Sequence, residues 1–361
     1  MISLSERLKS VAGISLSVAT TYSGRELIRH FDEGITYFLL PREKPNSEYD
    51  KSLEKYWIEI VNEFNPDIIH IHGTEYAHGL SCLNSCPQSR FVVSIQGLIG
   101  ASGDFYFSGI KHKDILWHIT IHDLLKRETL YQERRRFIRR SKFEKEYLTR
   151  IPHVIGRTDW DRAHTREINP EQKYHLCNEI LRGNFYKAKR WEISEKNDFS
   201  IFLSQAGYPL KGVHQVLKAI SIVKRYFPLV KVRIAGYNIT KVESIREKIR
   251  IGGYGSYLRS LISRLTLSEN VVFTGALDQD EMAEELRKAH LFICPSSIEN
   301  SSNSVAEAQI IGVPSITSFV GGLPSMIKHG ETGLLYRFED HIMLAYYIRQ
   351  IFENDQFATI L

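Results

Sequence analysis

The chain has 361 residues and a formal net charge of +5 at pH 7, with 43% hydrophobic and 25% charged residues. This composition is typical of globular proteins and excludes an intrinsically disordered chain. At roughly 100 to 200 residues per domain the length predicts two domains, and without a run of about 18 apolar residues no membrane-spanning helix is predicted.

The first residues, MISLSERLKS, lack the positively charged start and apolar core of a secretory signal, so a cytoplasmic protein is predicted. The four cysteines are Cys82, Cys86, Cys177 and Cys294. Their spacing matches neither a zinc site nor a redox-active pair, and we interpret them as reduced thiols.

Short β-rich segments alternate with helical patterns in the first half of the chain. The predicted strands occupy residues 14–20, 35–40, 67–73, 90–97 and 153–158. Between the second and third of these, Leu53, Trp57, Ile60 and Phe64 recur at the spacing of an amphipathic helix. Because helices separate the strands, the pattern predicts parallel βαβ units.

The segment Lys126–Arg150 carries ten basic and four acidic residues. One interpretation is a solvated helix with i,i+4 ion pairs such as Arg140 with Glu144. The other is peripheral contact of 126–150 with anionic lipid headgroups, or with a lipid-diphosphate substrate, at the inner face of the membrane. No nucleic-acid-binding module accompanies the charge, so nucleic acid is not an expected partner.

The polar stretch 189–198 interrupts the apolar pattern and predicts a boundary between an N-terminal domain at 1–188 and a C-terminal domain at 189–361. The later predicted strands occupy 199–205, 231–236, 270–275, 291–296 and 314–319, with helices at 212–227 and 279–290. The predicted fold class is therefore α/β, with two Rossmann-like domains whose parallel sheets face a central cleft.

Both ends of the sequence depart from this pattern. A doubly wound domain usually opens with the central strand of its sheet, whereas this chain opens with a short amphipathic helix and closes with one helix predicted at 341–361. We therefore expect the first strand of the N-terminal domain to be missing from the chain.

The stretch 295–324 places Glu299 and Glu307 eight positions apart around small polar residues. The helix predicted to begin near Ser304 presents free N–H groups and the positive end of its dipole, which favour an anion. Ser302, Asn303 and Ser304 are small enough to let a diphosphate approach. Since carboxylates accept hydrogen bonds from sugar hydroxyls, each glutamate is predicted to hold one ring of a nucleotide sugar.

A structural alternative exists for Glu307. Ser304 and Glu307 have the spacing of a capping box, in which each side chain bonds an exposed backbone N–H of the helix start. This alternative leaves Glu299 unexplained.

These motifs carry a resemblance. E-x7-E followed by G-V-P and V-G-G resembles the retaining glycosyltransferases of family 4, which have the GT-B fold, and PDIIHIHGTEY and FLSQAGYPLKGVHQVLKAI are similar to two further segments of that family. The resemblance implies that Glu299 contacts the donor sugar and Glu307 holds the nucleotide ribose. It also implies that Lys211, followed by Gly212, contacts the diphosphate. It further implies a chain that is shortened at both ends.

Lys211 has independent support, because it lies between a predicted strand and a helix start, where a cation and a helix N-terminus converge on a leaving phosphate. An ordinary surface lysine is the alternative. Family members often carry Gly-Arg ahead of this lysine, whereas Gly207 is followed by Tyr208 here. Arg157 is our candidate for the missing phosphate-binding cation.

The acceptor side departs from the family as well. Where members often show T-x-H-D near the donor sugar, this chain has Gln96 within Ser-Ile-Gln-Gly. Gln96 can bond a sugar hydroxyl but cannot act as a base. His72, at the end of its predicted strand, is our candidate for contact with the acceptor, against the alternative of a packed or solvated histidine.

The sequence thus predicts a retaining glycosyltransferase that moves a sugar from a nucleotide-diphosphate sugar to a glycan or lipid-linked glycan, in cell-surface polysaccharide biosynthesis. Glu299 and Lys211 are the predicted catalytic residues, and neither a metal nor another cofactor is expected.

Two alternatives remain open. The first is a truncated, non-catalytic relative that binds a nucleotide sugar or a partner transferase. The second is a metal-dependent GT-A enzyme in which Asp159 and Asp161 hold a divalent cation, although these aspartates also suit a helix cap.

Overall fold

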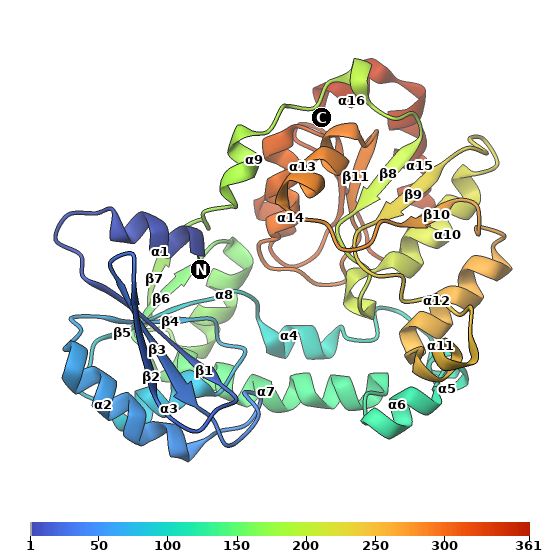
Figure 1. Ribbon diagram of the computed structural model, residues 1–361. Helices are drawn as coiled ribbons and strands as arrows, with labels where there is room; N and C mark the ends of the chain where they lie inside the picture. Colours follow the sequence, from blue (N-terminus) through green and yellow to red (C-terminus); the bar gives the residue numbers. More distant parts are fainter. Residues whose placement is uncertain (1) are drawn as a thin grey trace. The chain divides into compact units, whose positions relative to one another are not determined.

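The computed structural model describes residues 2–361, which form two compact units (Figure 1). Unit 1 comprises the residues up to Gly100 together with Arg136–Ile180. Unit 2 comprises Ala101–Arg135 together with Leu181–Leu361. The boundary predicted at 188 stays a prediction. By contacts alone, residues 101–135 group with the C-terminal part of the chain.

Unit 1 contains two separate sheets. In the first, the order is β1-β3-β2, with β1 parallel and β2 antiparallel to β3. In the second, β4-β5-β6-β7 are all parallel. The strands are β1 (Leu16–Tyr22), β2 (Ile28–Asp32), β3 (Ile35–Pro41), β4 (Ile69–His72), β5 (Phe91–Ser94), β6 (His153–Gly156) and β7 (Lys173–Leu176). The helices are α1 (Ile2–Lys9), η1 (Lys51–Leu53), α2 (Glu54–Phe64), α3 (His78–Ser85) and α8 (Asp159–Ile168).

Two helices, α4 (Ile99–Asp104) and α7 (Leu130–Arg150), cross from one unit to the other. The helix predicted over 126–150 begins only at Leu130, because α6 ends at Lys126 and Arg127 adopts the left-handed conformation. The predicted pair of Arg140 with Glu144 is wrong. Glu144 accepts instead from the backbone N–H groups of Ile99 and Gly100, while Arg140 donates to the carbonyl of Glu75.

Unit 2 is built on one six-stranded parallel sheet in the order β10-β9-β8-β11-β12-β13. Its strands are β8 (Ser200–Leu203), β9 (Lys231–Ile234), β10 (Val271–Phe273), β11 (Leu291–Cys294), β12 (Ser315–Ser318) and β13 (Leu334–Tyr336). This is the strand order of a doubly wound dinucleotide-type fold, in which the direction of winding reverses between β8 and β11.

Helices cover both faces of this sheet, so all residues of β8, β11 and β12 are buried. The helical elements of unit 2 are α5 (His112–Trp117), α6 (Ile121–Lys126), α9 (Gly183–Lys187), η2 (Ile193–Glu195), η3 (Pro209–Lys211), α10 (Val213–Val223), α11 (Ile245–Arg250), α12 (Gly253–Arg264), α13 (Gln279–Lys288), α14 (Asn303–Ile311), η4 (Leu323–Ser325), α15 (His341–Glu353) and α16 (Asp355–Ile360).

The prediction of an α/β chain with parallel sheets is confirmed, and every predicted strand overlaps an observed one. The single helix predicted at 341–361 is wrong. Asn354 adopts an extended conformation between α15 and α16, and its side chain accepts from Phe357 N to cap the second helix. Within residues 2–361, no helix combines the length and apolarity needed to cross a membrane.

Candidate donor site in unit 2

A small cavity lies at the carboxyl ends of β8 and β11, where the winding of the sheet reverses. Ligands of open α/β sheets bind at this point, because the loops after the two strands diverge and leave a crevice. The cavity is lined by Leu203, Ser204, Gln205, Lys211, Ile293, Cys294, Pro295, Ser296, Glu299 and Ser304. Three of the predicted site residues, Lys211, Glu299 and Ser304, therefore meet in one place.

Lys211 and Glu299 form an ion pair in this cavity, with Lys211 Nζ 2.8 Å from Glu299 Oε2. The two side chains are only 15% and 19% exposed, and Ser296 Oγ donates to the same carboxylate oxygen at 3.1 Å. Burial by itself lowers the pKa of the Lys211 ammonium, but the adjacent Glu299 carboxylate raises it, and the resulting pKa lies above the ordinary value. Lys211 is therefore held in its charged form.

Gly212 fixes the position of Lys211. It ends η3 and begins α10 with a φ of +67°, in the left-handed region that favours glycine. A Cβ at this position would lie 1.7 Å from the carbonyl oxygen of Pro295. Ser297 N also donates to the carbonyl of Leu210 at 2.8 Å. The loops after β8 and β11 thus touch through their backbones, which brings Lys211 to Glu299.

Helix α14 starts beside the cavity. Ser302 is its N-cap, in an extended conformation without a side-chain cap hydrogen bond, and Asn303 is its first residue. The hydroxyls of Ser302 and Ser304 are hydrogen-bonded to each other at 3.0 Å. The capping-box interpretation of Ser304 and Glu307 is therefore wrong. The prediction that the backbone N–H groups of this first turn bind an anion stays a prediction.

Glu307 lies one turn into α14 and is paired with Arg182, a residue that the sequence analysis did not identify. Arg182 Nε and Nη2 lie 2.9 and 2.8 Å from Glu307 Oε1. Burial raises the pKa of Glu307, and Arg182 offsets only part of that increase. The Arg182 guanidinium also lies over the Phe185 ring, 4.7 Å from its centroid. No motif around Arg182 indicates this pairing, since the partners are 125 positions apart in the chain.

Three other predicted residues meet in unit 1, at the carboxyl ends of three adjacent strands. His72 ends β4, while Gln96 and Arg157 follow β5 and β6. Arg157 Nη2 donates to Gln96 Oε1 at 2.8 Å, so Gln96 Nε2 is left to donate to His72 Nε2 at 3.0 Å. Burial, followed by His70, lowers the pKa of His72 to about 4, so the imidazole is neutral at pH 7. His72 Nδ1 then carries the proton, and it is buried without a hydrogen-bond partner among the described residues.

The guanidinium of Arg157 has protein partners on both terminal nitrogens. It donates to Glu179 Oε2 at 2.9 Å and to the carbonyl of Ile95 at 3.0 Å, in addition to Gln96. Its side chain is 5% exposed. The prediction that Arg157 supplies a second cation for the diphosphate stays a prediction. Within unit 2, Arg182 is an arginine that pairs with a predicted donor residue, Glu307.

The two aspartates of the metal-dependent alternative have different environments. Asp161 is fully buried and forms a capping box with Thr158, and its oxygens accept from Arg157 N at 2.9 Å and Tyr174 Oη at 2.5 Å. Asp159 is exposed beside Arg162. The cap interpretation is therefore confirmed for Asp161. No group of three or more His, Cys, Asp or Glu side chains within residues 2–361 is arranged to hold a metal ion.

Residues 186–360 match the family model described as "Glycosyl transferases group 1". The D-inositol 3-phosphate glycosyltransferase of Streptomyces coelicolor is 27% identical over 154 residues, 40% of this chain and 31% of that protein. The N-acetyl-alpha-D-glucosaminyl L-malate synthase of Bacillus anthracis is 33% identical over 168 residues, 46% of this chain and 39% of that protein. The chain thus spans less than half the length of these relatives.

Solved structures match over more of the chain. A sucrose-phosphate synthase of Thermosynechococcus elongatus superimposes with a TM-score of 0.67 over 99% of this chain and 85% of that one, at 17% identity. HepE of Anabaena, solved in complex with UDP and glucose, gives a TM-score of 0.60 over 91% and 78%, at 16% identity. These neighbours are GT-B glycosyltransferases. The alternative of a GT-A enzyme, which requires a different fold, is therefore wrong. Residues 186–360 thus match the glycosyl transferases group 1 model, and the chain has the GT-B fold of these neighbours.

Proposed function

We propose that this protein is a retaining, metal-independent glycosyltransferase that moves a sugar from a nucleotide-diphosphate sugar to a hydroxyl of a glycan or lipid-linked glycan. The observation that carries the proposal is the buried pair of Lys211 and Glu299 in the cavity where β8 and β11 diverge, beside the first turn of α14. A cation and helix N–H groups suit the diphosphate of a nucleotide sugar, and a carboxylate suits the hydroxyls of its sugar.

In the proposed reaction the bond between the sugar carbon and the diphosphate oxygen breaks, and negative charge gathers on the departing diphosphate. Lys211 and the N–H groups at Ser302, Asn303 and Ser304 stabilise that charge, a preorganised contribution worth about 3 kcal/mol for a single donor. Glu299 positions the sugar by accepting from its hydroxyls. The oxygen of the attacking acceptor hydroxyl forms the new bond to the sugar carbon, and the departing phosphate takes the proton of that hydroxyl.

Glu307 binds the ribose of the nucleotide in this proposal. Arg182 occupies one of its carboxylate oxygens, Oε1, and Oε2 is the atom that we assign to a ribose hydroxyl. The structure of HepE with UDP and glucose supports UDP as the first nucleotide to test.

The acceptor is assigned to unit 1. His72 and Gln96 are hydrogen-bonded to each other at the carboxyl ends of β4 and β5, and the Nδ1 proton of His72 has no partner among the described residues. An acceptor hydroxyl is a suitable partner for this proton. We place the protein in the cytoplasm, in peripheral contact with the inner face of the membrane, in cell-surface polysaccharide biosynthesis.

Donor hydrolysis tests the proposal. Release of nucleotide from UDP-sugars is measured for the wild type, Glu299→Ala and Lys211→Ala, with and without EDTA. Lys328→Ala is the matched control, because Lys328 forms a similar 2.7 Å pair with Glu331 but is 73% exposed. We expect loss of hydrolysis in the two site variants, normal activity in the control, and no effect of EDTA.

A wild type that binds the donor tightly without turnover would instead support the non-catalytic relative. Loss of activity with EDTA would contradict the metal-independent mechanism.

A further inference from the structure

Helices α5 and α6 carry an exposed apolar surface that the proposed donor site does not use. Five large side chains are exposed within ten residues of sequence, from Leu116 to Leu125. Their exposed fractions are 59% for Leu116, 86% for Trp117, 61% for Ile121, 63% for Leu124 and 75% for Leu125. Monomeric proteins rarely expose several large apolar side chains on neighbouring elements without a binding partner.

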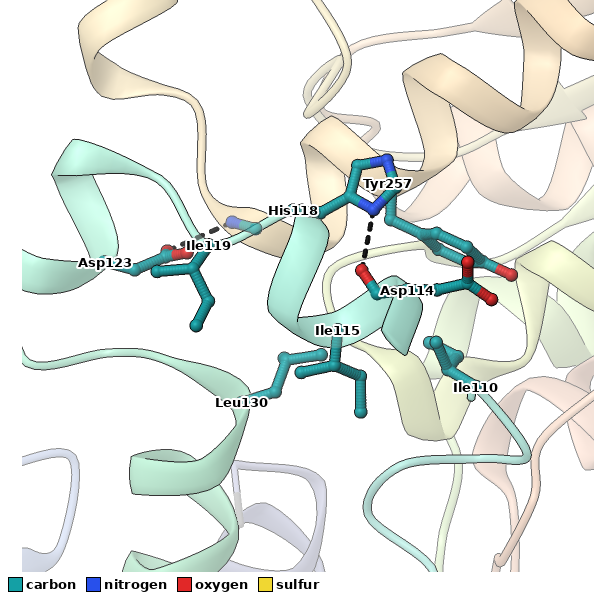
Figure 2. A pocket seen from close by; sticks show the side chains of 9 residues that line it. Ile110, Asp114, Ile115, His118, Ile119, Asp123, Leu130 and Tyr257 are labelled. Atoms are coloured by element: carbon teal, nitrogen blue, oxygen red, sulfur yellow. Dashed lines mark hydrogen bonds between the residues drawn. The ribbon is translucent and has the colours of Figure 1, made fainter. Parts of the chain in front are cut away.

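The opposite side of the same two helices is firmly packed. Ile115 is 4% exposed and belongs to the core of unit 2. Asp123 forms a capping box with Thr120 and accepts from Gly253 N at 3.0 Å, which ties α6 to the start of α12. Figure 2 shows this inner side, where Asp123 and His118 flank a small apolar cavity. The apolar residues are therefore exposed on an anchored element.

Helix α11 extends the surface. It contacts α6, as Figure 1 also indicates, and adds Ile245, 80% exposed, and Ile249, 48% exposed. We call these seven residues of α5, α6 and α11 the apolar surface.

Basic side chains surround the apolar surface. The exposed basic residues on and beside the three helices are Lys111, Lys113, Lys126, Arg127, Arg246, Lys248 and Arg250. The acidic residues of these helices are largely turned away. Asp123 is buried, Asp114 lines the inner cavity, and Glu247, 34% exposed, accepts from the backbone N–H of Glu243. The exposed acidic residues beside the helices are Glu128 and Glu243, fewer than the basic ones.

This combination indicates the kind of partner. The apolar centres of protein–protein interfaces are depleted in lysine, whereas an apolar helix face bordered by Lys and Arg, with Trp at its edge, is typical of a surface that lies on an anionic membrane. We propose that the apolar surface of α5, α6 and α11 binds the interface of an anionic lipid bilayer, with Trp117 and Leu125 inserted among the headgroups. The inference does not depend on the donor chemistry, and it places the contact before and beside residues 126–150 rather than along α7.

Vesicle binding tests this proposal. Co-sedimentation is measured with vesicles of phosphatidylcholine and with an equal mixture of phosphatidylcholine and phosphatidylglycerol, using the full chain. We expect binding to the anionic vesicles only, and a blue shift of tryptophan emission that Trp117→Phe removes, because Trp117 is the residue that leaves water. Binding that is equal on both vesicle types, or absent, would overturn the proposal.

Matched variants locate the contact. Leu125→Ser is compared with Leu229→Ser, since both leucines are 75% exposed and only Leu125 lies on the apolar surface. We expect roughly tenfold weaker vesicle binding for Leu125→Ser and wild-type binding for Leu229→Ser. Lys126→Glu should weaken binding as well, whereas Arg139→Glu, on the exposed side of α7, should not.

Two outcomes would refute the location. One is wild-type vesicle binding by Leu125→Ser with a loss caused by Arg139→Glu, which would place the contact on α7. The other is a Leu125→Ser variant whose only defect is conversion of a dimer to a monomer in light scattering, which would assign the surface to a second copy of the chain. Donor hydrolysis without vesicles should be unchanged in Leu125→Ser, so failure of this inference and failure of the proposed function are distinguishable.

Discussion

The pairing of Lys211 with Glu299 predicts opposite effects of two substitutions on nucleotide binding. In the structure the Lys211 ammonium is 2.8 Å from the Glu299 carboxylate, and both are more than four-fifths buried. A diphosphate that binds here has to share this cation with Glu299. Glu299→Gln should therefore bind UDP more tightly than the wild type, and Lys211→Met more weakly.

The magnitudes follow from the geometry. At 2.8 Å and an effective dielectric constant of about 20, the gross Coulomb attraction within the pair is about 6 kcal/mol, most of which desolvation offsets. If a quarter of this attraction becomes available to the diphosphate in Glu299→Gln, UDP affinity rises about tenfold. Lys211→Met removes a hydrogen bond to a charged group, worth about 1.5–3 kcal/mol, which corresponds to a loss of roughly 10-fold to 150-fold.

The pH dependence of UDP binding follows from the charge of Lys211. The folded-state pKa of Lys211 is raised, so its contribution is complete below the unfolded pKa of about 10.4 and is lost only as the pH rises through the higher folded value. The difference in UDP affinity between the wild type and Lys211→Met should therefore be constant between about pH 7 and pH 9.

Titration calorimetry with UDP on the wild type, the two single variants and the double variant measures these effects. Lys328→Met and Glu331→Gln serve as controls from the exposed pair. Equal weakening of UDP binding by Glu299→Gln and Lys211→Met would refute the reasoning, because it would mean that the pair supports the loops and does not compete with the diphosphate.

Three further substitutions test the scaffold of the two units. Gly212→Ala should lower the unfolding free energy by about 3 kcal/mol in urea, from left-handed strain and the backbone clash, while Gly207→Ala, with open space around its Cβ, should change it little. Arg182→Ala should destabilise by about 2 kcal/mol. Burial raises the pKa of Glu307, so its carboxylate is costly in the folded protein once Arg182 is removed. The loss of stability in Arg182→Ala should therefore grow as pH rises above about 4.5 and Glu307 ionises, as measured in thermal melts. Burial raises the pKa of Glu144 to about 7, so wild-type stability should fall as pH rises from about 4.5 to 7, by roughly 3 kcal/mol, and Glu144→Gln should remove this slope. A steeper dependence of stability on pH in Glu144→Gln than in the wild type would contradict the assignment of this dependence to Glu144.

Five of the six strands of unit 2 were predicted, and β13 (Leu334–Tyr336), which is three residues long, was missed. Strands β8 and β11 are wholly buried, so they read in sequence as short apolar runs bounded by turn residues. Strands β2 and β7 were missed for the opposite reason. All residues of β2 are exposed and three of the four in β7 are exposed, and without a buried face a strand leaves no apolar pattern.

The approach of Lys211 to Glu299 was predictable for a related reason. Lys211 and Glu299 each follow an apolar strand, and parallel strands bring their carboxyl ends to one edge of a sheet. The pairing of Glu307 with Arg182 had no such signal, because it depends on how the segment after residue 181 crosses α14. A charged pair without a local motif becomes visible only when the chain is folded.

The segment 101–135 shows most clearly why a boundary drawn from composition differs from one drawn from contacts. It follows strands of unit 1 in the chain, yet its Ser108 contacts the loop after β11, which in turn contacts the loop after β8. Burial lowers the pKa of His214 to about 3, so this imidazole is neutral. Its Nε2 donates to the carbonyl of Ser108 at 2.8 Å, and its Nδ1 accepts from the Tyr254 hydroxyl.

Ser108 in turn contacts the loop that follows β11. Its hydroxyl is hydrogen-bonded to the Ser297 hydroxyl at 2.8 Å, and Ser297 N donates to Leu210, the residue before Lys211. The chain of contacts from His214 through Ser108 and Ser297 therefore ends at the loop that presents Lys211. The same segment continues into α5 and α6, so the helices of the apolar surface and the loops of the candidate donor site belong to one packed unit, and lipid bound by the first would be held by the same scaffold that positions the second.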